Sequence, residues 1–280
     1  MSSQTEALCN ADFERLRALI YSETGIHLGP EKKTMLEIRL RRRLRNLNVS
    51  TFGEYCTRVF EPEGRARELV HLIDVVTTNK TDFFREAGHF DYLTSKALPD
   101  LAARYGSDRT CRIWSAGCST GEEPYTIAMA LSEYAETRPG FRFRVLATDI
   151  STSVLEKARM GIFRAELVRP VPAEMRRKYF MRSRDRGSDL MRVVPELRST
   201  IDFRRLNFME HDFGLPEAQE VIFCRNVIIY FDRQTQVRLL ARLVAELVPG
   251  GYFFAGHSES LQGMNLPLEP VAPSSYRKRG

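Results

Sequence analysis

Cysteine is scarce and unpatterned in this 280-residue chain. Its five cysteines, at positions 9, 56, 111, 118 and 224, form no C-x-x-C pair. This spacing argues against a disulfide framework and a metal site, and it favours a reducing compartment. No run of about 18 apolar residues occurs, so no membrane span is predicted. The first ten residues lack the basic start and apolar stretch of a signal peptide. We therefore expect a cytoplasmic protein with no bound metal.

Acidic residues are fewer than basic ones, which leaves a net charge of +6 and an isoelectric point of about 9.1. This balance indicates an acidic or polyanionic partner, without specifying whether it is nucleic acid, a membrane surface or a protein. Hydrophobic residues make up 43% of the chain and charged residues 28%, as in ordinary globular proteins. The length is sufficient for one large domain or two modest ones.

Strand patterns are absent before residue 110. The first 76 residues instead place apolar side chains, such as Phe13, Leu16 and Ile20, at helical spacing, which predicts a small all-helical domain over residues 1–76. Beyond residue 110, strands and helices alternate, so residues 77–280 are predicted to form an α/β domain with a doubly wound parallel sheet. Prolines and short β-favouring pieces interrupt the alternation, which predicts a small antiparallel subdomain over residues 162–206. The expected strands of the main sheet are 112–115, 141–150, 220–223 and 252–256, and those of the subdomain include 178–182, 190–194 and 200–204.

A loop of small residues joins the first of these strands to a helix, in the stretch W-S-A-G-C-S-T-G-E-E-P-Y at 114–125. At such a junction the backbone can approach a ligand closely, and Gly117 is placed to allow this. The acidic pair Glu122 and Glu123 would repel a nucleotide diphosphate at the helix start, whereas the sulfonium and ammonium groups of S-adenosylmethionine suit this charge. A purely structural alternative is a capping box formed by Thr120 and Glu123.

Further polar residues follow other strands. Asp149, at the end of the second strand, is placed to accept hydrogen bonds from ribose hydroxyls, although capping the next helix is an alternative. Arg225 and Asn226 follow a later strand, and Tyr230 offers a hydroxyl in the apolar run behind them. For the segment 77–86, a linker ending in a helix cap is the structural alternative to a binding role.

Five motifs occur in order: T-T-N-x-T-x-F-F-R-E at 77–86, W-S-A-G-C-S-T-G-E-E-P-Y at 114–125, A-T-D-I at 147–150, F-C-R-N-V-x-I-Y-F at 223–231 and P-G-G-Y-x-x-x-G-H-S-E at 249–259. Over nearly the whole chain they resemble the CheR-type chemotaxis receptor (protein-glutamate) O-methyltransferases. The resemblance implies a helical N-terminal domain followed by a class I methyltransferase-like sheet with an antiparallel insertion. It also implies methyl transfer from S-adenosylmethionine to glutamate side chains on the cytoplasmic helices of chemoreceptors during sensory adaptation.

The resemblance further implies roles for individual residues. Asn79, Thr81 and Arg85 would contact the methionine and sulfonium end of the cofactor. Glu123 would meet its charged amino-acid portion, and Asp149 its ribose. The adenine and methionine pocket would be lined by Asn207, Phe208, Arg225 and Asn226.

The implied reaction needs no general base, because a glutamate side chain with a pKa near 4.3 is already ionised at neutral pH. Catalysis is expected to come from alignment and partial desolvation, with Arg85 orienting a carboxylate and Tyr230 near the reacting centre. One rival is a nucleic-acid methyltransferase, which the missing Asn/Asp-Pro-Pro-aromatic motif disfavours. Another is a non-catalytic cofactor-sensing module, which the intact set of motif residues disfavours.

Five arginines lie within seven residues of one predicted helix, and Arg39, Arg42 and Arg43 share a face by their spacing. A solvated face is the structural alternative to a docking role. Because the implied substrate is a Glu-rich helix, we expect this face to steer and dock the receptor, with no nucleic-acid partner, no membrane insertion and a monomeric protein. The arginines are Arg39, Arg41, Arg42, Arg43 and Arg45.

Overall fold

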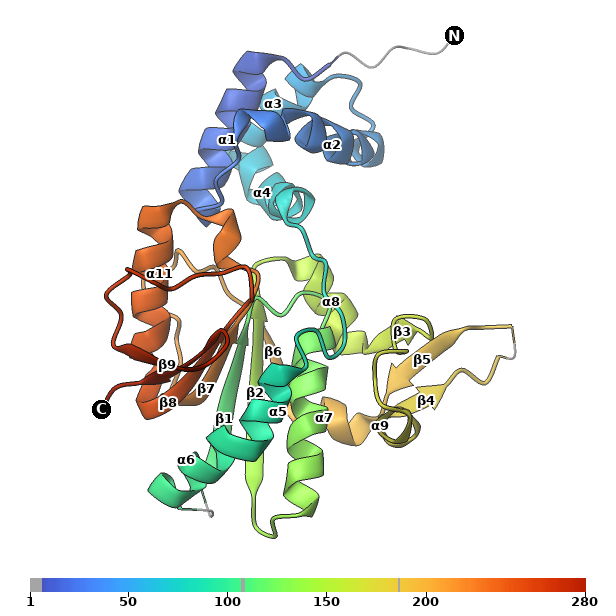
Figure 1. The fold of residues 1–280 in the computed structure, drawn as a ribbon. Helices are drawn as coiled ribbons and strands as arrows, with labels where there is room; N and C mark the ends of the chain where they lie inside the picture. Colours follow the sequence, from blue (N-terminus) through green and yellow to red (C-terminus); the bar gives the residue numbers. More distant parts are fainter. Residues whose placement is uncertain (1–6, 107–108, 186) are drawn as a thin grey trace. The chain divides into compact units, whose positions relative to one another are not determined.

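The structure is a computed structural model that describes residues 7–106, 109–185 and 187–280. The chain folds into two compact units (Figure 1). A helical unit contains the chain up to Thr78 together with residues 207–209 and 230–235. A sheet unit contains the remainder.

In the part of the chain that the structure describes, four α-helices build the helical unit. Gly25 ends the first helix with a left-handed backbone, and Thr51 caps the third through its side chain. The second helix buries Leu36, Leu40 and Leu44, each at most 2% exposed. The helices expected before residue 77 are therefore confirmed. Their bounds are α1 Asn10–Thr24, α2 Lys33–Leu47, α3 Phe52–Phe60 and α4 Pro62–Val76.

Among the described residues, seven strands form the main sheet in the order β6-β2-β1-β7-β8-β10-β9. The strands from β6 to β8 run parallel, and β10 runs antiparallel to both of its neighbours. This arrangement confirms the doubly wound α/β fold expected from the alternation of strands and helices. The bounds are β1 Thr110–Ala116, β2 Arg142–Asp149, β6 Ile201–Arg205, β7 Gln219–Cys224, β8 Leu247–Ala255, β9 Leu268–Ala272 and β10 Ser275–Lys278.

Helices connect the parallel strands, and α7 packs on β2 while α8 packs on β2 and β6. The centre of the sheet is apolar: every residue of β7 is buried, and the rings of Phe223 and Phe254 stack at 4.5 Å on neighbouring strands. Trp114 on β1 is fully buried, with its indole N–H bonded to Thr148 on β2 at 2.9 Å. The helices of this unit are α5 Gly88–Tyr92, α6 Leu98–Tyr105, α7 Glu122–Glu136, α8 Thr152–Met160 and α11 Arg233–Ala245, whose first residues belong to the helical unit.

A second, three-stranded sheet is inserted after α8, in the order β3-β5-β4 with both pairs antiparallel. Its strands are β3 Ile162–Arg164, β4 Phe180–Arg182 and β5 Leu190–Val193, and it is accompanied by α9 Ala173–Tyr179 and α10 Pro195–Arg198. Figure 1 shows these short strands beside the main sheet. The expected antiparallel excursion is thus present.

Two expectations for this region were wrong in detail. Residues 201–205 do not belong to the antiparallel insertion, because β6 pairs in parallel with β2 and forms an edge of the main sheet. The strand expected over 178–182 begins only at Phe180, because Lys178 and Tyr179 end helix α9. Both of those side chains bond the Glu133 carboxylate on α7 at 2.7 Å, which holds the helical turn in place.

The C-terminal hairpin of β9 and β10 was not anticipated. It extends the main sheet beyond β8, and the edge strand β9 contains Pro270 opposite Tyr276 of β10. None of the helices in the described residues combines the length and apolar character needed to cross a membrane.

Candidate active site

The motif residues of the sheet unit gather where parallel strands end. Gly117 follows β1, Asp149 closes β2, and Arg225 follows β7. Because the carboxyl ends of parallel strands lie at one edge of a sheet, these residues share one rim. The segment 79–86 joins them there, since the Ser119 hydroxyl of the glycine loop donates to the carbonyl of Asn79 at 3.0 Å.

The glycine loop leaves β1 in a conformation that only a residue without a side chain can adopt easily. Gly117 has φ +90°, and a Cβ at this position would lie 2.4 Å from Cγ2 of Val227. The capping-box alternative was wrong: Thr120 donates to Glu122 at 2.6 Å, and Glu123 turns away from the backbone of the helix start to bond Ser115 at 2.7 Å.

Asp149 is fixed from both sides at the tip of β2. Its Oδ2 accepts the N–H of Ser119 at 2.9 Å, and its Oδ1 accepts the N–H of Ser151 at 3.0 Å. The helix-cap alternative was wrong for this residue, because the Ser151 hydroxyl caps α8 by accepting the N–H of Val154. The carboxylate is therefore held in place at the rim of the sheet.

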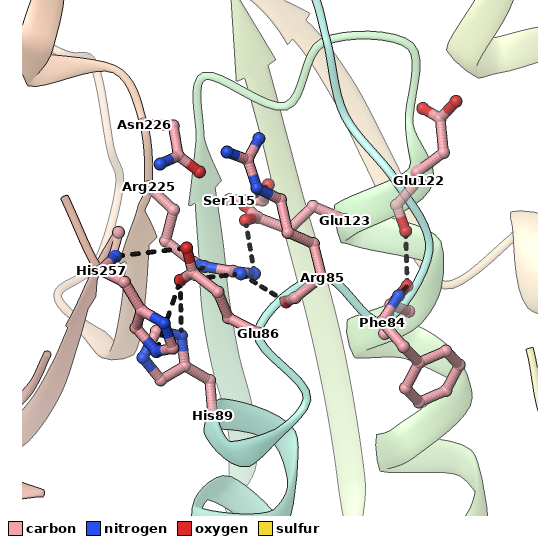
Figure 2. Close-up of polar contacts among 12 residues, drawn as sticks. Phe84, Arg85, Glu86, His89, Ser115, Glu122, Glu123, Arg225, Asn226 and His257 are labelled. Carbon is pink, nitrogen blue, oxygen red and sulfur yellow. Dashed lines mark hydrogen bonds and ion pairs between the residues drawn. The ribbon is translucent and has the colours of Figure 1, made fainter. Parts of the chain in front are cut away.

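Arg225 is the buried cation of the site, with its side chain only 2% exposed (Figure 2). It pairs with Glu86 at 3.1 Å and with Glu123 at 3.2 Å, and it donates to the main-chain carbonyl of Arg85. Burial raises the pKa of Glu86, but Arg225 and the N–H of His257 outweigh this effect and lower the pKa overall. Burial raises the pKa of Glu123, with Arg225 and Ser115 opposing it.

Arg85 lies between two residues in the left-handed region, Phe84 at φ 53° and Glu86 at φ 56°. This conformation is costly for residues with side chains and persists only where neighbours hold it, as the Thr126 hydroxyl does by accepting the N–H of Phe84 at 3.2 Å. The Arg85 guanidinium bonds the carbonyl of Lys80 at 3.3 Å. Figure 2 shows it pointing away from the ion pairs below, toward the side where the amide of Asn226 lies.

The remaining predicted cofactor residues fall in different places. Asn226, with φ 58°, is part of the rim, and Thr81 is half-buried in the segment leading to Arg85. The predicted cofactor residues Asn207 and Phe208 belong to the helical unit, as does Tyr230, which was predicted to lie near the reacting centre. There Asn207 donates to the carbonyl of Glu23 at 2.6 Å, Tyr230 donates to the carbonyl of Thr78 at 3.3 Å, and Phe208 is buried.

The arginines of α2 do not share one surface role. Arg39 donates to the carbonyls of residues 75, 76 and 77 and so satisfies the end of α4. Arg43 forms a two-pronged pair with the buried Glu68 at 2.8 and 2.9 Å, and Arg41 pairs with Glu37. Of the face predicted from spacing, which comprises Arg39, Arg42 and Arg43, Arg42 alone is exposed. Arg45, which lies outside that face, is exposed as well.

Sequence reasoning missed a polar cluster beneath Arg85. The ligand atoms of Glu86, His89 and His257 lie within 4.8 Å of one another, which is close enough for a cation. The Arg225 guanidinium already neutralises Glu86, so we assign no metal there. Burial, followed by the charge of Arg225, lowers the pKa of His89 to about 4, which leaves this imidazole neutral at pH 7. His257 inside the fifth motif was the available signal, whereas His89 lies outside the motifs.

A second missed residue is Glu259, the last letter of the fifth motif. It is 4% exposed and accepts backbone N–H groups from the turn after β7. An acidic residue two positions after a Gly-His pair at a strand end was the signal.

Comparison with known protein families identifies the family to which this chain belongs. Residues 79–276 match the SAM-binding domain of CheR methyltransferases, and residues 11–77 match the all-alpha domain of the same family. The chain belongs to the CheR methyltransferase family. It is 44% identical to the chemotaxis protein methyltransferase of Escherichia coli, over 91% of this chain and 86% of that protein. It is 40% identical to the one from Borreliella burgdorferi, over 95% and 94%. It is 42% identical to chemotaxis protein methyltransferase 2 of Pseudomonas aeruginosa, over 95% and 92%.

The cofactor of this CheR-family chain is S-adenosylmethionine. The residues present fit it: the carboxylates of Glu123 and Asp149 stand at the rim for a cationic, ribose-bearing ligand.

Proposed function

We propose that this methyltransferase forms glutamyl methyl esters on the cytoplasmic helices of chemoreceptors, and that it does so in the cytoplasm as a monomer. The proposal rests on which groups contact the Arg85 guanidinium. Among the described residues no carboxylate pairs with its guanidinium, whereas Arg225 neutralises the neighbouring acids Glu86 and Glu123. Arg85 is therefore available to bind a carboxylate from outside the chain.

The chemistry of the rim suits a nucleophile that arrives already ionised. Burial raises the pKa values of the Cys118 and Cys224 thiols well above their usual range, so these groups stay protonated. The neutral His89 imidazole is 2% exposed and out of reach of a substrate. A glutamate carboxylate needs no base, because it is ionised at neutral pH, whereas an amine must lose a proton.

Bound S-adenosylmethionine supplies the methyl group. We propose that Asp149 accepts hydrogen bonds from its ribose, and that Glu123, Asn79 and Thr81 hold its amino-acid end. Asn226 and Arg225 complete the pocket, with Gly117 giving access to the backbone. Arg85 orients the incoming carboxylate, so the reacting oxygen is aligned and partly desolvated. Asn207 and Phe208 are proposed to line the adenine side.

Tyr230 is proposed to act near the reacting centre through its hydroxyl. In the helical unit this hydroxyl donates to the Thr78 carbonyl, which is one residue before the Asn79 segment. Replacement by phenylalanine removes only that oxygen. An unchanged turnover number in Tyr230→Phe would assign the residue to packing alone.

Receptor docking is proposed for the helical domain, with its boundary between residues 76 and 77. The exposed Arg42 and Arg45 on α2 supply positive charge that a Glu-rich helix would seek. The double variant Arg42→Ala/Arg45→Ala should raise the receptor KM at low salt and leave cofactor affinity unchanged. Arg138→Ala, at an exposed arginine of the sheet unit, is the matched control. A loss of cofactor affinity as large as the rise in receptor KM would contradict a docking role for these arginines.

The deciding experiment uses tritiated S-adenosylmethionine and receptor cytoplasmic fragments, followed by mild alkali. Label released as methanol identifies a methyl ester on a carboxylate. Label that resists base, or that appears only on RNA or DNA, refutes the proposed substrate. An Arg85→Lys variant tests whether Arg85 binds the substrate carboxylate, because lysine keeps the charge but loses the two-pronged carboxylate geometry.

A further inference from the structure

Glu259 is a buried carboxylate bonded by four main-chain N–H groups. Its Oε2 accepts from Gly256 at 2.7 Å and from Asn226 at 2.8 Å. Its Oε1 accepts from Val227 at 2.8 Å and from Ile228 at 3.0 Å. An ionised carboxylate offers about four lone-pair sites, so these contacts match its full accepting capacity.

The four donors lie just beyond the ends of two different strands of the sheet. Gly256 follows β8, and the other three form the turn that leaves β7, 33 to 31 residues earlier in the chain. No arginine or lysine of the described residues pairs with this carboxylate, so its charge is balanced by backbone dipoles alone. Hydrogen bonds to a charged acceptor are the stronger kind, which makes the link between β7 and β8 rigid.

The turn held in this way carries residues of the cofactor rim. Asn226 is in the left-handed region at φ 58°, a conformation that needs support in a residue with a side chain. Val227 next to it places its Cγ2 where a Cβ of Gly117 would be. The position of the turn therefore fixes both the Asn226 backbone and the packing of Val227 against Gly117 of the glycine loop.

We propose that Glu259 is a positioning residue of the methyltransferase: its carboxylate locks the turn of residues 226–228 in the binding conformation before the cofactor arrives. Glu259 acts through the backbone it holds and does not need to touch the cofactor. Preorganisation of this kind lowers the ordering cost that binding must otherwise meet, so affinity depends on it. The inference depends on cofactor use and is independent of the receptor substrate.

The first test compares Glu259→Gln with a matched control. Glutamine keeps the shape but places an NH₂ group against N–H donors, so at least two of the four hydrogen bonds are lost. Glu220→Gln is the control, because Glu220 is equally buried at 3% and is bonded by the N–H and side chain of Arg112, near the start of β7. Both variants are compared by the affinity of the folded protein for S-adenosylhomocysteine, measured by calorimetry.

We expect Glu259→Gln to bind S-adenosylhomocysteine at least tenfold more weakly, which corresponds to about 1.4 kcal/mol, and Glu220→Gln to bind within about twofold of the unchanged protein. Glu259→Asp, which keeps the charge but shortens the reach, should lie between them. Wild-type affinity in folded Glu259→Gln overturns the proposal, and so does an equal loss in both glutamine variants, because that would reflect stability alone.

A second test needs no variant and applies even if Glu259→Gln fails to fold. In the unchanged protein without cofactor, the amides of residues 226–228 and 256 should already exchange their hydrogens slowly. Addition of S-adenosylhomocysteine should then change their exchange little. Fast exchange that slows only when the cofactor analogue is added shows that the ligand orders the turn, and this result overturns the proposal.

Discussion

Replacing Arg225 by methionine should destabilise the protein in a way that depends on pH. The guanidinium is 2% exposed and lies 3.1 and 3.2 Å from the carboxylates of Glu86 and Glu123. At an effective dielectric constant of about 20, each contact corresponds to roughly 5 kcal/mol of Coulomb energy, much of it offset by desolvation. Removing one partner of a buried pair costs about 3–5 kcal/mol, because the remaining charges are left uncompensated.

The sign of the pH dependence follows from the two glutamates. With Arg225 present the pKa of Glu86 is lowered, so this pair stabilises the fold above the unfolded pKa and the gain is lost as pH falls. Without Arg225, burial raises the pKa values of both acids. A carboxyl group whose pKa is higher in the folded than in the unfolded state destabilises the fold at pH values above the unfolded pKa. The second effect makes the deficit of the variant largest near pH 8 and smaller toward about pH 5, and the first reduces the deficit only at still lower pH, below the unfolded pKa.

Urea unfolding of Arg225→Met and the unchanged protein at several pH values measures this deficit. Arg104→Met removes an exposed pair with Asp100 and serves as the control, for which we expect less than about 1 kcal/mol and little pH dependence. A deficit for Arg225→Met that is below about 1 kcal/mol, or that is constant from about pH 8 to about pH 5, would refute the reasoning.

Three further predictions concern other parts of the chain. Gly117→Ala should abolish binding of S-adenosylhomocysteine in calorimetry, whereas Gly140→Ala, at φ +88° with open space around it, should bind normally and lose only about 1 kcal/mol of stability. Arg43→Met should lower the free energy of unfolding by about 3–5 kcal/mol because its glutamate partner is buried, while Arg42→Ala should change it by less than about 0.5 kcal/mol in the same urea titrations. Asp149→Asn should weaken S-adenosylhomocysteine binding about tenfold or more, and unchanged affinity would remove the ribose role.

Periodicity in the sequence was sufficient for the main architecture. Apolar spacing located the helices of the first 76 residues, and strand–helix alternation located β1, β2, β7 and β8. It failed for β9 and β10, where three prolines at 267, 270 and 273 are typical of a loop. It also failed for β6, because which strand a short β-favouring segment pairs with depends on tertiary neighbours.

Local spacing could not reveal which residues are used internally. Arg39 and Arg43 have the spacing of a surface stripe, yet both side chains bond to α4. Arg39 donates to the carbonyl of Val75, and Arg43 pairs with the carboxylate of Glu68. The roles of Arg225 and Glu259 depend on backbone groups at least 31 residues away in the chain, apart from the nearby Gly256. The motifs identified the right segments. Which residues of a segment make internal contacts depends on neighbours that come together only in the folded protein.

The C-terminal hairpin has a consequence for solubility. Strand β8 is buried at all but one of its nine positions, and β10 covers its hydrogen-bonding edge. Removal of the hairpin would leave a long, apolar strand with unpaired N–H and C=O groups, which is the arrangement that recruits other chains into aggregates. The edge that replaces it, β9, is short and contains Pro270, so it is a poor template for further pairing. Shortened versions of this protein that keep Glu259 but end before β9 should therefore precipitate even though the cofactor rim is untouched.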